Sequence, residues 1–103
     1  MSILEVQEGI QEQSADEIIT YQVTTTNWVS SPTNTTVAAF DESNNDKDVT
    51  SIVFPVNNPG EAGDVITLSP AKSMTAGHVY RIEVKFVVGS NTYECFFRVK
   101  CDY

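Results

Sequence analysis

Few side chains in this sequence could bind a metal ion or act as a nucleophile. Its 103 residues contain one histidine, His78, and two cysteines, Cys95 and Cys101. Zinc sites use three or four Cys, His or carboxylate ligands held close together, and these three residues do not form such a set. Motifs for an activated serine, a cysteine–histidine pair or a phosphate-binding loop are also missing from the sequence. We therefore expect no enzyme activity, no catalytic residue, no cofactor and no metal, and we place His78 in a surface turn.

The densest group of polar side chains forms a loop between Asp41 and Asp48. This loop also contains Asn44, Asn45 and Asp46. Calcium prefers carboxylate and amide oxygens as ligands. The spacing differs from that of an EF-hand, and the terminal Glu of that motif is missing. We interpret the loop as an ordinary polar connection with Asx turns, and we do not expect calcium binding.

The two cysteines lie six residues apart in what the pattern predicts to be one strand. At about 3.4 Å per residue, their Cα atoms would be about 20 Å apart, whereas a disulfide needs less than about 7 Å. We expect Cys95 to be a buried thiol and Cys101 to be the more exposed of the two. Thiols that cannot pair indicate folding in a reducing compartment.

The chain is strongly acidic, with fourteen acids, six bases and a formal charge of −8. Such a surface is repelled by phosphate backbones and by anionic membranes, so we expect neither a nucleic-acid nor a membrane partner. Residues 1–9 lack the basic region and apolar run of a secretory signal. We expect synthesis in a reducing cytoplasm without such a signal, and incorporation into a virion is left open.

The length and the alternation of apolar residues predict one all-β domain over residues 1–103. The first 16 residues form an acidic segment, either weakly structured or an edge strand near residues 3–6. Further strands are predicted over residues 17–26, 35–40, 49–54, 65–68, 78–88 and 91–101. About seven short strands with turn residues between them, and no helix, indicate an antiparallel β-sandwich or barrel.

The last hairpin is the most regular part of the sequence. Gly89 and Ser90 separate two alternating segments, and Gly at the first position of a two-residue loop suits a type II′ turn. That turn fixes a register in which every inward pair is apolar. The predicted pairs are Phe86–Tyr93, Val84–Cys95, Ile82–Phe97 and Tyr80–Val99.

The outward side of this hairpin holds four of the six basic residues, with Phe96 among them. One interpretation is a solvated face whose charges prevent edge pairing. The other is a basic, aromatic contact surface for an acidic partner, which could be the N-terminal segment of the same chain or of a second copy. The candidate contact residues are Arg81, Lys85, Phe96 and Arg98, and the expected partner is another protein or a second copy.

The segment from Met74 to Val84 resembles the entry to the penultimate strand of fibronectin type III domains and their immunoglobulin-like relatives. The resemblance implies an immunoglobulin-like Greek key in which the Tyr80 hydroxyl bonds to upstream backbone near residues 74–76. It also implies that Met74 is the apolar residue before that corner. Trp28 is similar to the buried Trp of these sandwiches. Either a bulge near Asn27 turns it inward, or it lies beyond the strand and covers one end of the core.

The chain is also similar to small immunoglobulin-like proteins encoded among phage and prophage structural genes. The first functional hypothesis is therefore a non-enzymatic structural or protein-interaction module, as a component or accessory of a phage-like particle. The alternative is a carbohydrate-binding module that uses its loops. That site would combine Trp28 with residues 30–34 and 41–48.

Overall fold

In the computed structural model of the chain, the described residues are 3–5, 10–26 and 28–103. Nearly all regular structure is β, which confirms the all-β class. The strands are β1 (Ile3–Glu5), β2 (Gln11–Gln13), β3 (Gln22–Thr24), β4 (Thr33–Asp41), β5 (Lys47–Asp48), β6 (Gly60–Ala62), β7 (Val65–Thr67), β8 (Val79–Val88) and β9 (Asn91–Cys101). The helical segments are the 3-10 turn η1 (Glu42–Asn44) and the single-turn helix α1 (Thr50–Val53).

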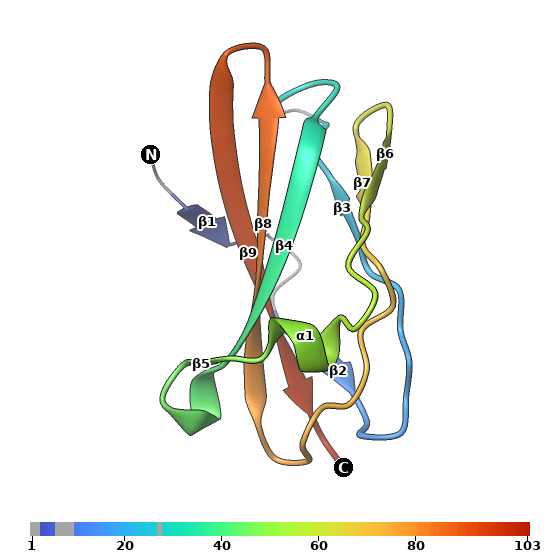
Figure 1. Cartoon of the computed structure of the whole chain (residues 1–103), viewed down its shortest axis with the longest axis vertical. Coiled ribbons are helices and arrows are strands. Elements are labelled where there is room, and N and C mark those ends of the chain that lie inside the picture. Colours follow the sequence, from blue (N-terminus) through green and yellow to red (C-terminus); the bar gives the residue numbers. More distant parts are fainter. Residues whose placement is uncertain (1–2, 6–9, 27) are drawn as a thin grey trace.

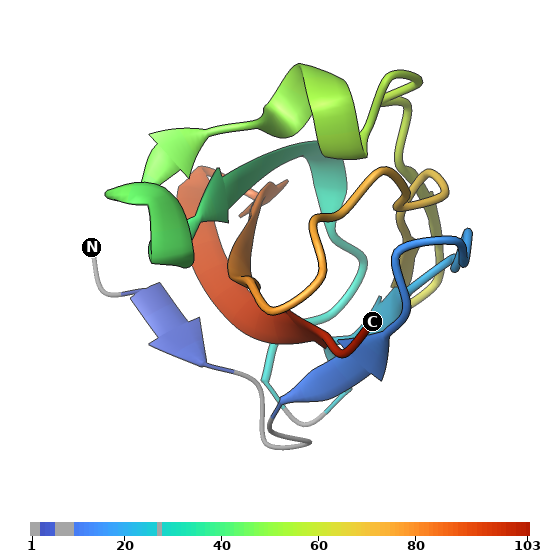
Figure 2. The same cartoon turned by 90° about the horizontal axis from the view of Figure 1, so that it is seen from below.

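The described strands form two sheets. The large sheet has the order β1-β9-β8-β4-β5, with β2 also on β9, and the small sheet has the order β3-β7-β6. Figure 1 shows the long strands of the large sheet beside β3, β7 and β6, and Figure 2 shows the strands arranged around a common centre. Both β1 and β2 pair with β9 in parallel, whereas the other strand pairs are antiparallel. The N-terminal segment thus contributes edge strands, and Val6 lies outside the described residues.

The hairpin of β8 and β9 has the predicted register at every pair, from Tyr80 opposite Val99 to Val88 opposite Asn91. Gly89 has a φ of 61°, and Ser90 is not among the residues of positive φ, as a type II′ turn requires. Alternate side chains of both strands are buried, which matches the apolar pattern. Local turn chemistry and hydrophobic burial therefore select the same pairing.

The core lies between the two sheets. Fully buried side chains come from the hairpin, including Ile82, Phe86 and Val99, and from the β7 region, including Ile66 and Leu68. Each buried aliphatic or aromatic side chain of this size contributes about 1.5–3 kcal/mol relative to its exposed form. Burial of these apolar side chains is thus the main force that holds the sheets together.

One buried polar side chain also joins the sheets. The Gln13 side chain is 1% exposed, and its Nε2 donates to the carbonyl oxygens of Glu17 and Ala71, each at 2.9 Å. Its Oε1 accepts from the Tyr21 hydroxyl at 2.9 Å. The side-chain amide of Gln13 belongs to β2 of the large sheet. Its hydrogen-bond partners all lie in segments next to the small sheet, so the buried amide is fully hydrogen-bonded.

The strand predicted over residues 49–54 is wrong, because α1 occupies residues 50–53. Asp48 directs the turn, since its carboxylate accepts from the Thr50 N–H at 3.0 Å and from the Thr50 hydroxyl at 2.7 Å. Helix formation still buries Val53 and Phe54. A short apolar run fits a strand or a helical turn equally well by pattern alone.

Trp28 lies beyond β3 and is 38% exposed. Its ring meets Phe86 edge-on at 5.3 Å and Tyr93 edge-on at 5.7 Å between ring centroids. It therefore covers one end of the core, as the second alternative predicted. The proposed bulge near Asn27 lies outside the described residues.

Both cysteines are free and buried. Burial of Cys95 was predicted, but greater exposure of Cys101 is wrong, because its exposed fraction is 0%. The end of β9 is covered on both sides, since Cys101 is paired with Gln13 of β2 and exchanges backbone hydrogen bonds with the turn at residues 77–78. Of the helical segments in the described residues, none has the length and apolar character needed to cross a membrane.

Candidate functional site

The hairpin register places the four predicted contact residues on one side of the large sheet. Arg81 is opposite Arg98, Lys85 is opposite Glu94, and Phe96 is opposite Glu83. Strand β4 adds Phe40 opposite Arg81. We call this surface the outer face, defined by Phe40, Arg81, Lys85, Phe96 and Arg98.

Arg81 is anchored by three carboxylates on the outer face. Its guanidinium binds Asp46 with two hydrogen bonds of 2.7 and 2.9 Å, and it also contacts Glu42 at 3.0 Å and Glu83 at 2.8 Å. Hydrogen bonding to Asp46 raises the pKa of Arg81, and the same contact lowers the pKa of Asp46. The guanidinium also lies 4.9 Å from the centroid of the Phe40 ring. These contacts hold the planar guanidinium group of Arg81 in one orientation.

Arg98 repeats this arrangement on β9. Its Nε donates to Glu42 at 2.9 Å, and its guanidinium lies 5.1 Å from the centroid of the Phe96 ring. Glu42 therefore bridges the two arginines, each of which stacks on a phenylalanine. The result is a fixed arrangement of rings and guanidinium planes on a β-sheet.

The outer face is less basic than its strand residues alone suggest. The Lys85 side chain is 55% exposed, and its Nζ lies 3.7 Å from Oε1 of Glu94. Arg81, Lys85 and Arg98 are met by carboxylates that include those of Glu42, Asp46, Glu83 and Glu94. Glu42 and Asp46 come from the loop after β4, and the sequence pattern gave no sign of their partners. The predicted excess of positive charge is therefore balanced within the chain.

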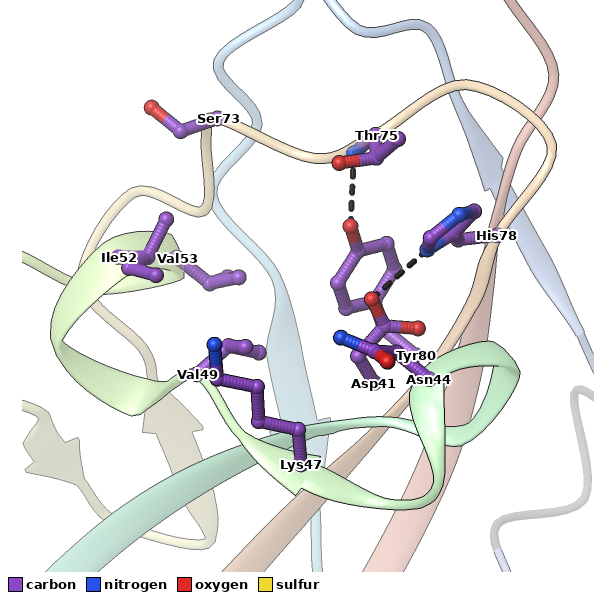
Figure 3. A pocket seen from close by; sticks show the side chains of 10 residues that line it. All are labelled: Asp41, Asn44, Lys47, Val49, Ile52, Val53, Ser73, Thr75, His78 and Tyr80. Atoms are coloured by element: carbon purple, nitrogen blue, oxygen red, sulfur yellow. Dashed lines mark hydrogen bonds and ion pairs between the residues drawn. The ribbon is translucent and has the colours of Figure 1, made fainter.

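A cavity of about 180 Å³ lies between the loop after β4, helix α1 and the connection to β8. Figure 3 shows Asp41, Asn44 and His78 on one side of the cavity and Val49, Ile52 and Val53 on the other. The lining residues are Asp41, Asn44, Lys47, Val49, Ile52, Val53, Ser73, Thr75, His78 and Tyr80.

An aspartate–histidine pair forms part of this cavity wall. Asp41 is 4% exposed, and its Oδ2 lies 2.7 Å from Nδ1 of His78. The other carboxylate oxygen accepts from the Ser43 N–H at 3.1 Å. The His78 side chain is 32% exposed and stacks near Tyr80, so it is half-buried rather than a simple surface residue. Within the described residues, no hydroxyl or thiol hydrogen-bonds to this ring, so a base–nucleophile pair is not assembled.

Tyr80 forms the floor of the cavity. It is 2% exposed, and its hydroxyl accepts a hydrogen bond from the Thr75 N–H at 2.7 Å (Figure 3). The predicted bond from the Tyr80 hydroxyl to backbone at residues 74–76 is confirmed. Met74 is 4% exposed and joins the hydrophobic core. The corner therefore fixes the connection that leads into β8.

The carboxylates of the loop after β4 bind protein groups in three different directions. Asp41 faces His78, Asp46 binds Arg81, and Asp48 caps the turn at Thr50. In the described part of the chain, no group of three or more His, Cys, Asp or Glu residues has a metal-binding arrangement. The loop oxygens thus serve the fold and the outer face.

The loops suggested for carbohydrate binding lie at opposite ends of β8. Trp28 packs against Phe86, whereas Asp41 pairs with Tyr80. Six residues of strand, at about 3.4 Å each, separate those two positions by about 20 Å. A single small sugar could not contact both loops.

No protein-family model matches the chain, and no curated protein matches it.

Proposed function

We propose that this chain is a non-enzymatic structural or protein-interaction module and that the outer face is its contact surface. The observation that carries the proposal is the bridge from Glu42 to Arg81 and Arg98, which fixes both guanidinium groups over aromatic rings. Arginine and aromatic side chains are enriched where protein interfaces derive most of their affinity. Because these side chains are already ordered, docking costs less conformational entropy than it would on a mobile surface.

The module is proposed to be an immunoglobulin-like Greek key. In that architecture strands A, B, E and D form one sheet and strands C, F and G form the other. The N-terminal strands of this chain pair instead with β9. The order β3-β7-β6 facing β4-β8-β9 supports this assignment when the strands are taken in chain order. The buried corner formed by Tyr80 and Thr75 also supports it. A rigid sandwich of this kind can present one sheet face to a partner.

The charge balance of the outer face favours a partner of mixed polarity over a purely acidic one. Each cation of this face has an acidic neighbour, so a simple negative surface would also meet Glu42, Glu83 and Glu94. We propose that the partner is a protein of a larger assembly, such as a phage-like particle.

Sedimentation of extracts from the source of this protein tests the proposal. We expect the wild-type chain to sediment with a large assembly. Each of the single variants Phe96→Ser and Lys85→Glu should instead sediment as free protein. These changes leave the Arg81–Glu42–Arg98 bridge in place. The matched controls are Val56→Ser at a 65% exposed apolar position and Lys72→Glu away from the outer face. An unchanged distribution for both outer-face variants would contradict the proposal.

A second candidate function is binding of a small polar ligand, such as a monosaccharide, in the cavity beside His78. Within the described residues, the side chains of Asn44, Lys47 and Ser73 line this cavity without a hydrogen-bond partner in the chain. Titration with glucose, galactose and N-acetylglucosamine, followed by amide NMR shifts, tests this candidate. Saturable shifts at these three residues that Asn44→Ala weakens would support it, and no shift at millimolar sugar would contradict it.

A further inference from the structure

Among residues 3–5, 10–26 and 28–103, the backbone around β3 forms hydrogen bonds on one side only. Its bonding partners recur at every second residue, which is the pattern of an antiparallel strand at a sheet edge. The N···O distances of these bonds are 2.8 to 3.1 Å. They join Ile19 with Ala71, Tyr21 with Leu68 and Thr25 with Asp64.

The intervening residues direct their backbone groups away from the small sheet. Successive N–H and C=O groups alternate across a strand, so those of Thr20, Gln22 and Thr24 face outward. Strand β3 is terminal in the order β3-β7-β6, and no described strand pairs with it on that side. The side chains of these three residues are exposed. Within the described residues, the edge is therefore open to another strand.

The long edge of the large sheet is treated differently. Along β4, the Thr35 N–H is bound by Glu61, the Val37 carbonyl by Asn57, and the Ala39 N–H by Thr50. On the opposite edge, β1 and β2 cover parts of β9. Natural proteins protect sheet edges in this way because an open edge recruits other strands.

The open edge also lacks the side chains that usually prevent pairing. Residues 18–40 contain no Asp, Glu, Lys or Arg, so all of the −8 formal charge lies elsewhere. No proline occurs in residues 20–26, and Thr and Val there favour extended structure. The outward side chains of the small sheet are also uncharged near this edge, at Gln22, Thr24, Val65 and Thr67.

We propose that two copies of this chain pair antiparallel through β3, about a two-fold axis at Gln22. The three-stranded sheets would join into one continuous sheet, with Gln22 opposite its own copy and Thr20 opposite Thr24. A second copy fits this edge because like-charged acidic chains repel one another except across an uncharged contact, and residues 18–40 carry no charged side chain. An edge strand of this kind is also self-complementary under two-fold symmetry.

The proposed contact is small and leaves the outer face exposed on the other sheet. A contact limited to one edge strand buries less than the roughly 1,000 Å² of a stable interface, so the dimer should form only at high protein concentration. Salt gives a distinctive test of its chemistry. Because the contact itself is neutral and the copies are acidic, added salt should strengthen association rather than weaken it.

Amide hydrogen exchange of the wild-type chain, measured by NMR at low and high protein concentration, tests the pairing directly. We expect the Gln22 and Thr24 amides to exchange fast in dilute samples and to slow at least about tenfold on association, because each gains an acceptor. The Val23 amide should be protected in both samples. Equal exchange at both concentrations would overturn the proposal, whether the mass stays monomeric or rises through another surface.

Sedimentation of Gln22→Pro gives a second test, because proline removes the outward N–H and can be placed on an edge strand. The matched control is Gln22→Thr, which keeps the N–H and favours a strand. We expect only the proline variant to lose concentration-dependent mass. Retention of the dimer by a folded Gln22→Pro chain would overturn the proposal, and if that variant does not fold, the wild-type exchange measurement decides alone.

Discussion

The hydroxyl oxygen of Tyr80 accepts a hydrogen bond from the backbone N–H of Thr75 at 2.7 Å. The two residues are five positions apart, and the bond closes the connection that enters β8. Because Tyr80 is 2% exposed, water cannot readily replace its hydroxyl. The bond therefore ties the edge of the core to the strand that carries Arg81.

Replacement of Tyr80 by Phe should destabilise the fold by about 1–3 kcal/mol, because it leaves the Thr75 N–H without its acceptor. Urea denaturation should show a lower midpoint with an unchanged slope. Tyr93→Phe is the matched control, since the Tyr93 hydroxyl makes only an exposed contact of 3.4 Å with Asn91. Equal midpoints for the two variants would show that the Tyr80 bond contributes little.

Replacement of Gln13 by Ala should be more damaging than Gln11→Ala on the same strand. The Gln13 change leaves two carbonyl oxygens and the Tyr21 hydroxyl without their partner, and each such loss costs about 1–3 kcal/mol where the group stays buried. Thermal unfolding should reveal a large drop for Gln13→Ala and a small one for Gln11→Ala. Similar melting temperatures would mean that water replaces the amide.

Tyr21 should ionise only at high pH. Burial, and secondarily the charge of Glu17, raise the pKa of Tyr21 from 10.0 to about 12. Folding thus favours the protonated phenol, so this contribution to stability is complete below pH 10 and disappears as the pH rises from 10 to about 12. Absorbance at the tyrosinate band should lose a step near pH 12 in Tyr21→Phe. An early, unshifted ionisation of Tyr21 would contradict the burial of its ring.

Both thiols should react slowly in the folded, reduced chain. Burial raises the pKa of Cys95 to about 11 and also raises the pKa of Cys101, so the reactive thiolate is scarce at neutral pH. Labelling with iodoacetamide, followed by mass spectrometry, should modify two thiols in denaturant and neither quickly in native buffer. Rapid native modification of Cys101 would mean that the end of β9 opens in solution.

The final hairpin could be predicted in detail because its determinants are local. The Gly89 turn fixes the register, and the alternation of apolar residues agrees with it. The hydrogen bond from upstream backbone to the Tyr80 hydroxyl could also be predicted. The residues before Tyr80 resemble the entry to the penultimate strand of fibronectin type III domains, in which such a bond occurs. Local chemistry and hydrophobic period specify these features together.

Contacts between distant segments could not be predicted in the same way. The acids that hold Arg81 include Asp46 and Glu42, which lie 35 and 39 residues away in the chain. Burial of Cys101 likewise depends on β2 and on the turn before β8, so its place near the chain end was misleading. Tertiary packing determines both the acidic partners of Arg81 and the burial of Cys101. The periodic pattern of apolar residues in the sequence does not indicate such long-range contacts.

Site-specific photocrosslinking at position 96 tests the central claim, that the outer face binds a protein partner. A benzophenone side chain placed at Phe96 should give one discrete adduct of a larger mass in extracts from the source of this protein. The same group at Val56, an exposed apolar position outside this face, should give none. Equal crosslinking at both positions, or none at position 96, would contradict the claim.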